Sequence, residues 1–181
     1  RLALYFSNHY PNLVRGVLLE SSSPGLATEA ERVSRVQQDQ ELAKRIQNEG
    51  IEGFVNYWEN IPLFATQSTL PHNVQQAIRE ERLSQQAIGL ANSLRGMGTG
   101  VQPSQWHLLP TLKVPVMIVV GELDKKFVNI GKSMNEHFKH SQLIVVEKAG
   151  HAVHLEEPEK FATIVYDDFY NMIETFERGE S

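Results

Sequence analysis

Two stretches of this sequence decide its fold: Val119-Val120-Gly121-Glu122-Leu123-Asp124 and Val145-Val146-Glu147-Lys148-Ala149-Gly150-His151. Each begins as a short run of β-branched residues, which is typical of a strand, and ends abruptly in glycine and an ionisable side chain. A helix over about 127–139 and a strand over about 143–146 are expected within this part of the chain. Because successive parallel strands end at one edge of a sheet, where open α/β sheets bind ligands, the terminal aspartate and histidine should share a site.

These two residues form a candidate catalytic pair. Asp124 would accept the Nδ1–H of His151 and fix the ring tautomer, so that Nε2 can take a proton from a serine. Each residue also has a simpler interpretation, because Asp is a common turn residue and a loop histidine can be exposed and idle. Gly150, which lets the backbone turn sharply, and the matched positions of the pair favour the catalytic interpretation. His154 is interpreted as a helix-cap or pocket-wall residue.

The nucleophile of such a triad is missing. No Gly-x-Ser-x-Gly sequence occurs in the 181 residues. Ser21-Ser22-Ser23 follow a strand expected over about 14–20, but proline and glycine come next, which indicates a loop and not a strained strand-to-helix turn. The chain opens directly in a helix, Leu2-Ala3-Leu4-Tyr5-Phe6, without a cap or a leading strand. We therefore expect the serine to precede Arg1 in a longer protein.

The composition is that of a globular protein with one core. Hydrophobic residues make up 41% and charged residues 22%, which are ordinary values for such a protein. No apolar run approaches the ~20 residues that a membrane helix needs, and no signal peptide is visible. The absence of cysteine excludes disulfides, thiolate metal sites and a cysteine nucleophile, and it fits a cytoplasmic location. A net charge of −5 argues against broad nucleic-acid binding but allows a local basic pocket.

Strand–helix alternation at both ends of the chain flanks a block of helices. Residues 1–26 read as helix, strand and loop, and the alternation resumes with a strand over about 115–120 and a last helix over about 158–177. Residues 27–100 are polar, glutamine-rich and helical. The pattern predicts an α/β domain of residues 1–26 and 101–181, with residues 27–100 forming a helical cap over its ligand edge.

Several signals divide the helical block. Thr28 and Glu31 form a capping box that begins a long helix running to about residue 48. Gly50 and Gly53 are expected to bracket a turn into a shorter helix that a proline ends. Two more helices are expected over about 71–94.

The motifs around the candidate pair resemble the α/β-hydrolase superfamily. Its catalytic-histidine loop is similar to Ala149-Gly150-His151 with His154, Glu157 and Pro158, and its acid loop to Gly121-Glu122-Leu123-Asp124. Motifs over essentially the whole chain narrow the resemblance to the 2-succinyl-6-hydroxy-2,4-cyclohexadiene-1-carboxylate synthase family of menaquinone (vitamin K2) biosynthesis. They are Arg1-Leu2-Ala3, Leu19-Glu20 followed by Ser23-Pro24-Gly25-Leu26, Glu31-Arg32-Val33-Ser34-Arg35, Trp58 with Pro62-Leu63-Phe64, Arg82, Val101-Gln102-Pro103, and Gly-Glu-x-Asp-x-Lys-Phe over 121–127.

This resemblance implies a fold and a missing segment. The chain would be the C-terminal part of an α/β-hydrolase fold, a parallel sheet flanked by helices, with an inserted all-helical cap. In the family the nucleophile elbow reads Gly-x-Ser-x-Gly-Gly-Arg, and Arg1 matches its last residue. The serine and the first half of the fold would then precede Arg1, and the chain alone would be inactive.

The resemblance also implies that Arg1, Arg35 and Arg82 line the pocket and bind substrate carboxylates. A planar guanidinium suits this role, because it matches a carboxylate bidentately and keeps its charge when desolvated. Arg32 is a weaker candidate, since helix geometry can turn it outward. The simpler interpretation is that the arginines are solvated or paired with nearby carboxylates at helical spacing. The available partners are Glu29, Glu31, Glu80 and Glu81.

Three aromatic residues complete the candidate site. In the family a Trp at the place of Trp58 contacts the substrate, although an aromatic residue in this setting is as readily part of the cap core. Phe64 and Phe127 are candidate apolar pocket walls and, equally, candidate core residues.

The activity that the resemblance implies is a carbon–oxygen lyase. It would remove pyruvate from 2-succinyl-5-enolpyruvyl-6-hydroxy-3-cyclohexene-1-carboxylate, with the triad serine acting as the base and the arginines holding a substrate that carries three carboxylates. No metal and no organic cofactor is implied. The expected partner is this small tricarboxylate, with neither nucleic acid nor membrane, and the expected assembly is a monomer or a weak homo-oligomer.

Two other functions remain open at this point. An ordinary carboxylesterase or C–C bond hydrolase would share the triad but would need a mainly apolar acyl pocket. Alternatively, the chain is an inactive serine-less scaffold or fragment. Convergence of Arg1, Arg35 and Arg82 on one ligand would separate the lyase from the esterase. The sequence just before Arg1, where we expect Ser-x-Gly-Gly, would separate an enzyme from a scaffold.

Overall fold

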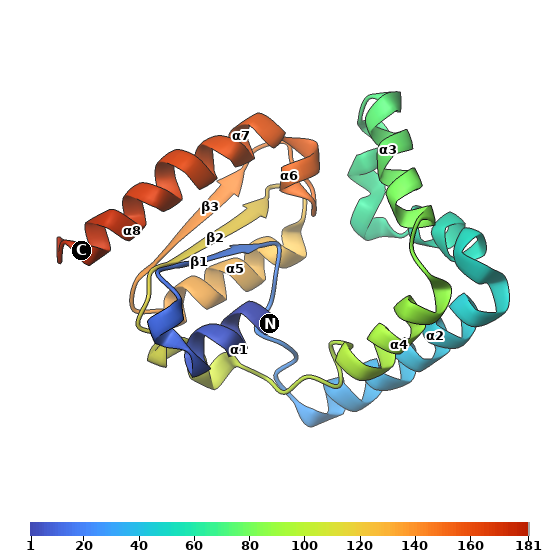
Figure 1. Cartoon of the computed structure of the whole chain (residues 1–181), viewed down its shortest axis with the longest axis horizontal. Coiled ribbons are helices and arrows are strands. Elements are labelled where there is room, and N and C mark those ends of the chain that lie inside the picture. The colour runs from blue at the N-terminus through green and yellow to red at the C-terminus, as the bar shows by residue number, and fades with distance from the viewer. Residues whose placement is uncertain (181) are drawn as a thin grey trace. The chain divides into compact units, whose positions relative to one another are not determined.

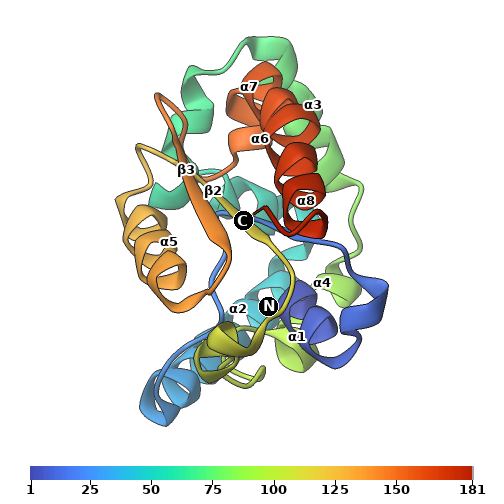
Figure 2. The same cartoon turned by 90° about the vertical axis from the view of Figure 1, so that its left-hand side faces the viewer.

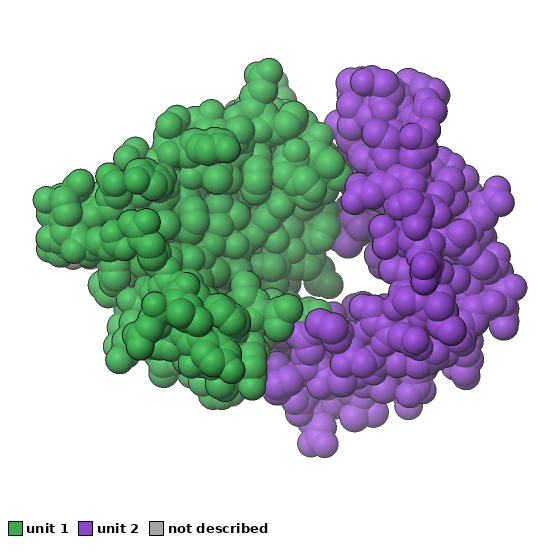
Figure 3. Space-filling view, viewed as in Figure 1, with its two compact units in different colours: residues 1–24, 105–181 green, residues 25–104 purple. Residues whose placement is uncertain are grey.

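A computed structural model describes residues 1–180 of the chain. The chain forms two compact units (Figure 3). The first unit consists of residues 1–24 and 105–181 and contains the sheet. The second consists of residues 25–104 and contains helices only. The sequence placed these boundaries at 26/27 and 100/101. The helical unit is inserted between the first and second strands.

Three parallel strands form the sheet of the first unit, in the order β1-β2-β3. They are β1 Val17–Glu20, β2 Val116–Gly121 and β3 Ser141–Val146. All six residues of β2 are buried, which explains why the central strand is a continuous apolar run. β1 is shorter than the predicted strand over 14–20. Its ladder begins with the bond from Val17 N–H to the Pro115 carbonyl, because the neighbouring strand starts only at residue 116.

Helices cover both faces of this sheet. The helical elements of the first unit are α1 Leu2–His9, η1 Pro11–Leu13, η3 Trp106–Thr111, α5 Lys125–His137, α6 Val153–Glu156, α7 Pro158–Thr163, η4 Ile164–Phe169 and α8 Tyr170–Glu177. Alternate residues of β2 point to opposite faces. One set packs with α1 and α5, and the other packs with α6 and the helical segments that follow it (Figures 1 and 2). Both faces of the central strand β2 are therefore buried, whereas the edge strand β3 is only partly covered.

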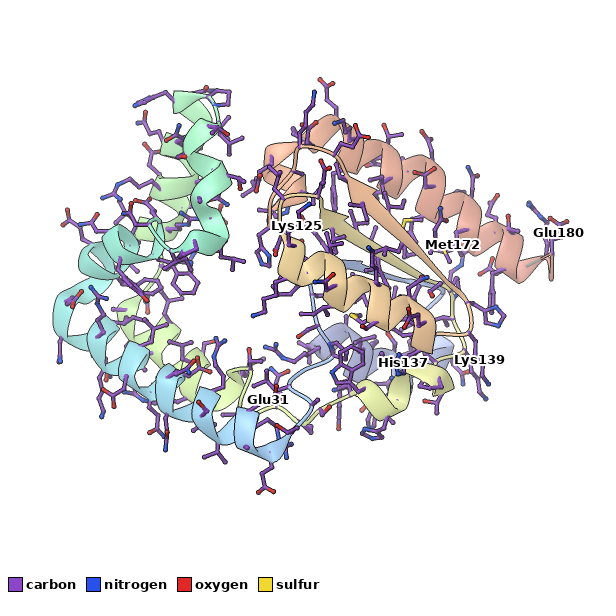
Figure 4. The ribbon with its side chains drawn as sticks, turned by 180° about the vertical axis from the view of Figure 1, so that it is seen from behind. Glu31, Lys125, His137, Lys139, Met172 and Glu180 are labelled. Atoms are coloured by element: carbon purple, nitrogen blue, oxygen red, sulfur yellow. The ribbon has the colours of Figure 1, made fainter. Side chains whose placement is uncertain are left out.

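Two helices of the first unit differ from their predicted form. α5 begins at Lys125, slightly before the predicted start, because the Asp124 side chain caps it (Figure 4 labels Lys125 and His137, its two ends). The last helix was predicted as one α-helix over 158–177. It contains a π-helical segment, Ile164–Phe169, between α7 and α8.

The second unit is built on one long, broken helix. Its elements are α2 Glu29–Trp58, η2 Pro62–Thr69, α3 His72–Leu83 and α4 Ala87–Met97. The predicted capping box is present at the start of α2: the Glu31 carboxylate accepts the Thr28 N–H at 2.9 Å, and the Thr28 hydroxyl accepts the Glu31 N–H at 3.2 Å. Gly50 breaks α2 with φ 71°, a conformation that favours glycine. Gly53, predicted to share this turn, is helical instead, so one glycine suffices for the break.

Candidate active site

Asp124 and His151 meet at the edge of the sheet where β2 and β3 end. His151 Nδ1 lies 2.7 Å from Asp124 Oδ2, which confirms the contact predicted from the sequence. A carboxylate can only accept, so Nδ1 carries the proton and Nε2 is the ring nitrogen that can exchange a proton with a nucleophile. The Asp124 side chain is only 7% exposed and that of His151 21% exposed, so the hydrogen bond is largely shielded from water.

The second oxygen of Asp124 has a structural role. Oδ1 accepts the N–H of Phe127 at 3.2 Å and thereby caps α5. The Phe127 ring in turn packs edge-on against His151, with 4.7 Å between the ring centroids, and also contacts the core beneath the sheet. Phe127 is thus both a core residue and a neighbour of the candidate catalytic histidine. The core interpretation of Phe127 is confirmed, and its role as a pocket wall stays a prediction.

Close backbone packing sets the position of the histidine loop, which we define as residues 147–152. The Leu123 N–H donates to the Ala149 carbonyl at 2.9 Å, which ties this loop to the acid loop. A side chain at Gly121 would collide with the carbonyl oxygens of Ala149 and Gly150. Glycine at the end of β2 therefore allows the two loops to lie close enough for the Asp–His contact.

A second carboxylate–imidazole pair lies at the end of β1. Glu20 accepts the backbone N–H of His154 at 3.0 Å and lies 2.8 Å from His154 Nδ1. His154 was predicted to be a helix-cap or pocket-wall residue, and the structure shows that it anchors α6 to β1. Sequence reasoning missed Glu20. The available signal was its position as the last residue of the first strand.

The serine run after β1 forms a loop, as predicted. Ser21 adopts φ 37°, which is rare for a residue with a side chain, and it is 8% exposed. The hydroxyls of Ser21 and Ser22 have no hydrogen-bond partner among residues 1–180. The next helix begins only at Glu29, so this segment is not a strand-to-helix elbow.

The candidate arginines of α2 lie in different hollows of the second unit. Arg35 Nε donates to Asp39 Oδ1 at 2.7 Å, and Asp39 is only 2% exposed. Arg35 and Tyr57 line one shallow hollow, whereas Arg32 lines another with Val101. The sequence analysis proposed that nearby glutamates could pair with these arginines. It missed Asp39, whose spacing of four residues from Arg35 was a usable signal.

Arg82 borders a pocket of about 470 Å³ in the second unit. Its Nη2 donates to Gln67 Oε1 at 2.7 Å, its Nη1 lies 4.0 Å from Glu59 Oε1, and its guanidinium lies 5.0 Å from the centre of the Phe64 ring. Burial lowers the pKa of Arg82, although an arginine in a protein stays cationic. Arg79, which the sequence analysis did not select, lines the same pocket and pairs with Glu59.

The remaining candidates have simpler surroundings. Trp58 stacks on Phe54 at 5.3 Å between ring centroids and lies 5.7 Å from Phe64, so it belongs to the aromatic core of the helical unit. Arg1 is half-buried at the start of α1 in the first unit. Among residues 1–180, no group of His, Asp and Glu side chains could hold a metal ion. Within the same residues, none of the helices combines the length and apolar character needed to cross a membrane.

Known proteins are similar to this chain in sequence and in fold. The family described as alpha/beta hydrolase fold matches residues 1–158. A Bacillus subtilis (strain 168) protein, provisionally named 2-succinyl-6-hydroxy-2,4-cyclohexadiene-1-carboxylate synthase, is 47% identical over 165 residues, or 91% of this chain and 60% of that protein. The protein of that name from Serratia proteamaculans (strain 568) is 30% identical over 90% of this chain and 61% of its own length. The structure of MenH from S. aureus has a TM-score of 0.92 at 38% identity and covers 95% of this chain and 65% of that chain. The chain thus spans about three fifths of the length of its curated relatives.

Proposed function

The chain belongs to the α/β-hydrolase fold family, and we propose that it supplies the acid and the histidine of a carbon–oxygen lyase of menaquinone biosynthesis, as part of a longer protein. The observation that carries this proposal is the 2.7 Å contact between His151 and Asp124, in a chain that is 47% identical over 91% of its length to a relative named for this synthase activity. We propose further that residues 25–104, inserted between β1 and β2, act as the cap of the fold.

The proposed reaction is an elimination within a cyclohexene ring. In 2-succinyl-5-enolpyruvyl-6-hydroxy-3-cyclohexene-1-carboxylate, the succinyl group joins ring carbon 2 through a ketone, so the hydrogen on that carbon is acidic. A base removes this proton, and its electron pair forms a double bond between carbons 2 and 3. The ring double bond then moves to carbons 4 and 5, and the carbon–oxygen bond at carbon 5 breaks. The leaving enolpyruvate takes up a proton and becomes pyruvate, while the ring becomes the 2,4-cyclohexadiene.

In this proposal Asp124 and His151 turn a serine into the base. The serine, expected upstream of Arg1, would give its proton to Nε2 of His151 and would then take the proton from ring carbon 2. Asp124 holds the imidazole in the required tautomer and stabilises the imidazolium that forms. The 7% exposure of the Asp124 side chain supports this role, because shielding from water strengthens the interaction between the carboxylate and the ring.

The arginines would bind the carboxylates of the substrate. We assign this role to Arg1, Arg35 and Arg82, with Arg32 a weaker candidate. Arg35 is oriented by Asp39 through its Nε, which leaves the Nη end of the guanidinium as the group that a ligand carboxylate would meet. For Arg82, the pocket beside Phe64 offers an apolar wall next to the cation. A substrate with three carboxylates would require several cationic side chains even in a chain with a net charge of −5.

The proposal is tested on the longer protein that carries this chain. Its sequence is expected to read Ser-x-Gly-Gly immediately before Arg1, and the protein is expected to release pyruvate from the cyclohexene substrate. His151→Ala should lower kcat by about a thousandfold or more, because the triad acts as a unit. Thermal unfolding should change little, since His151 lies on a loop.

The outcomes separate the candidate functions. Pyruvate release that is lost in His151→Ala supports the lyase. A protein that hydrolyses neutral esters and releases no pyruvate is an esterase, and the lyase proposal fails. A protein without either activity is a scaffold.

A further inference from the structure

The histidine loop is held in an irregular backbone conformation. It leaves β3 through Lys148, whose φ of 66° is unusual for a residue with a side chain. The Lys148 N–H donates to the Glu122 carboxylate at 3.2 Å. A loop in this conformation depends on partners for its N–H groups, because it has no regular ladder of its own.

Glu156 supplies two of these partners, one on each side of His151. Its Oε2 accepts the N–H of Gly150 at 2.6 Å, and its Oε1 accepts the N–H of Ala152 at 3.2 Å. Hydrogen bonds from a charged carboxylate are the stronger kind. Both oxygens of one side chain thus fix the peptide groups that flank the candidate catalytic histidine.

The helix that carries Glu156 is itself held in place. Glu156 ends α6, and Val153, which begins this helix, is fully buried in the core beside β2. Glu20 accepts the backbone N–H of His154 at the same time, so α6 is anchored to the end of β1. A carboxylate on an anchored helix does not move with the histidine loop and can therefore hold the loop in place.

We infer that Glu156 is a positioning residue for His151. By holding the N–H groups of Gly150 and Ala152, it keeps the imidazole aimed at Asp124 at a distance of 2.7 Å. The inference rests on the proposed function, because it assigns Glu156 to the same catalytic pair. Glu156 would act only through the backbone of the loop and would not touch the reacting atoms.

The experiment compares Glu156→Gln with the matched control Glu157→Gln in the longer protein. Glutamine keeps the size of the side chain, but its amide nitrogen cannot accept an N–H, so one of the two bonds is lost. Glu157 is the next residue and pairs with Lys160 at 3.0 Å, and no hydrogen bond joins its carboxylate to the N–H groups of the loop among residues 1–180. The two variants change the same charge at neighbouring positions.

Two readouts follow from the geometry. The first is the low-field proton resonance that an imidazole N–H gives when it is bound to a carboxylate, assigned by its loss in Asp124→Asn. It should broaden or vanish in Glu156→Gln and stay unchanged in Glu157→Gln. The second is catalysis: Glu156→Gln should lower kcat about tenfold to a hundredfold, the scale expected for a misplacement of about 1 Å, with KM nearly unchanged.

Each outcome decides the inference. A Glu156→Gln protein that keeps both the resonance and kcat overturns it, even when its melting temperature falls, because Glu156 then has only a general structural role. Should this variant fail to fold, amide hydrogen exchange of the unaltered protein decides. Protection of the Gly150 and Ala152 N–H groups supports their hydrogen bonds to Glu156, and exchange at the rate of an unstructured peptide overturns the inference. Failure of the proposed function appears separately, as an unaltered protein that shows the resonance but releases no pyruvate.

Discussion

The two oxygens of Asp124 have different tasks, and two substitutions at this position separate them. Oδ2 accepts the Nδ1–H of His151 at 2.7 Å, and Oδ1 accepts the N–H of Phe127 at 3.2 Å as the N-cap of α5. Asp124→Asn keeps an oxygen for the cap but presents an N–H group to the imidazole. Asp124→Ala removes both interactions. We therefore expect the two variants to share a catalytic defect and to differ in stability.

The magnitudes follow from the two interactions. Asn and Asp are equally good N-caps, whereas Ala at such a position costs about 1 kcal/mol. In a protein of about 150–250 residues that cost lowers the melting temperature by about 2–4 °C, and in a longer protein by less, so only Asp124→Ala should show a shift. In serine proteases the same Asp→Asn change lowers kcat about 10⁴-fold, because the histidine is left in the wrong tautomer. A loss of that order is expected here for both variants.

The assay combines thermal unfolding with pyruvate release by the longer protein that carries this chain. Thr28→Ala is the matched control, since it removes the N-cap of α2 at a similar cost and leaves the Asp–His pair intact. It should lower the melting temperature without a comparable loss of kcat. An Asp124→Asn protein that retains kcat within about tenfold would refute the role of Asp124 as the triad acid. An Asp124→Asn protein as unstable as Asp124→Ala would refute the capping argument.

Three further predictions concern the arginines, the glycine at the end of β2 and the C-terminal helix. Arg35→Ala and Arg82→Ala should each lower kcat/KM for the tricarboxylate about tenfold to a hundredfold, since a charge-assisted hydrogen bond is worth about 1.5–3 kcal/mol. Both should leave turnover of p-nitrophenyl acetate nearly unchanged, and an equal loss with that neutral ester would mark the arginines as structural. Gly121→Ala should lower both the melting temperature and kcat, because the added methyl group meets two backbone carbonyls of the histidine loop; an unchanged kcat would contradict this. The hydrogen bond from Arg15 lowers the pKa of Glu177. The stabilisation that this ion pair gives the folded chain is therefore fully present above the ordinary carboxyl pKa, and it is lost as the pH falls through the lowered pKa. Glu177→Gln should remove this loss from the curve of melting temperature against pH. An identical pH profile for the variant would refute the assignment.

The sequence predicted those features that repeat regularly along the chain or lie at the ends of strands. The apolar runs indicated β2 and β3, and the shared edge of parallel strands was enough to predict that Asp124 and His151 lie together. The capping box at Thr28 was equally visible, because it is a local pattern of two residues. The π-helical segment within the last helix was not visible, since its apolar spacing does not differ enough from that of an α-helix to be recognised.

What the sequence could not show is which polar side chain holds which backbone group. Glu156 and Glu157 are neighbours of identical chemistry in front of a proline, and both read as surface carboxylates at a helix start. In the folded chain Glu156 accepts two N–H groups of the histidine loop, whereas Glu157 pairs with Lys160 at the surface. The difference arises from the direction in which α6 leaves the loop, and that direction is set by the burial of Val153 and by the anchor at Glu20. Hydrophobic patterns specify which side chains are buried, but the partners of irregular backbone depend on angles between elements that only the complete packing determines. Residues that position a catalytic group will therefore be missed from sequence more often than the catalytic group itself.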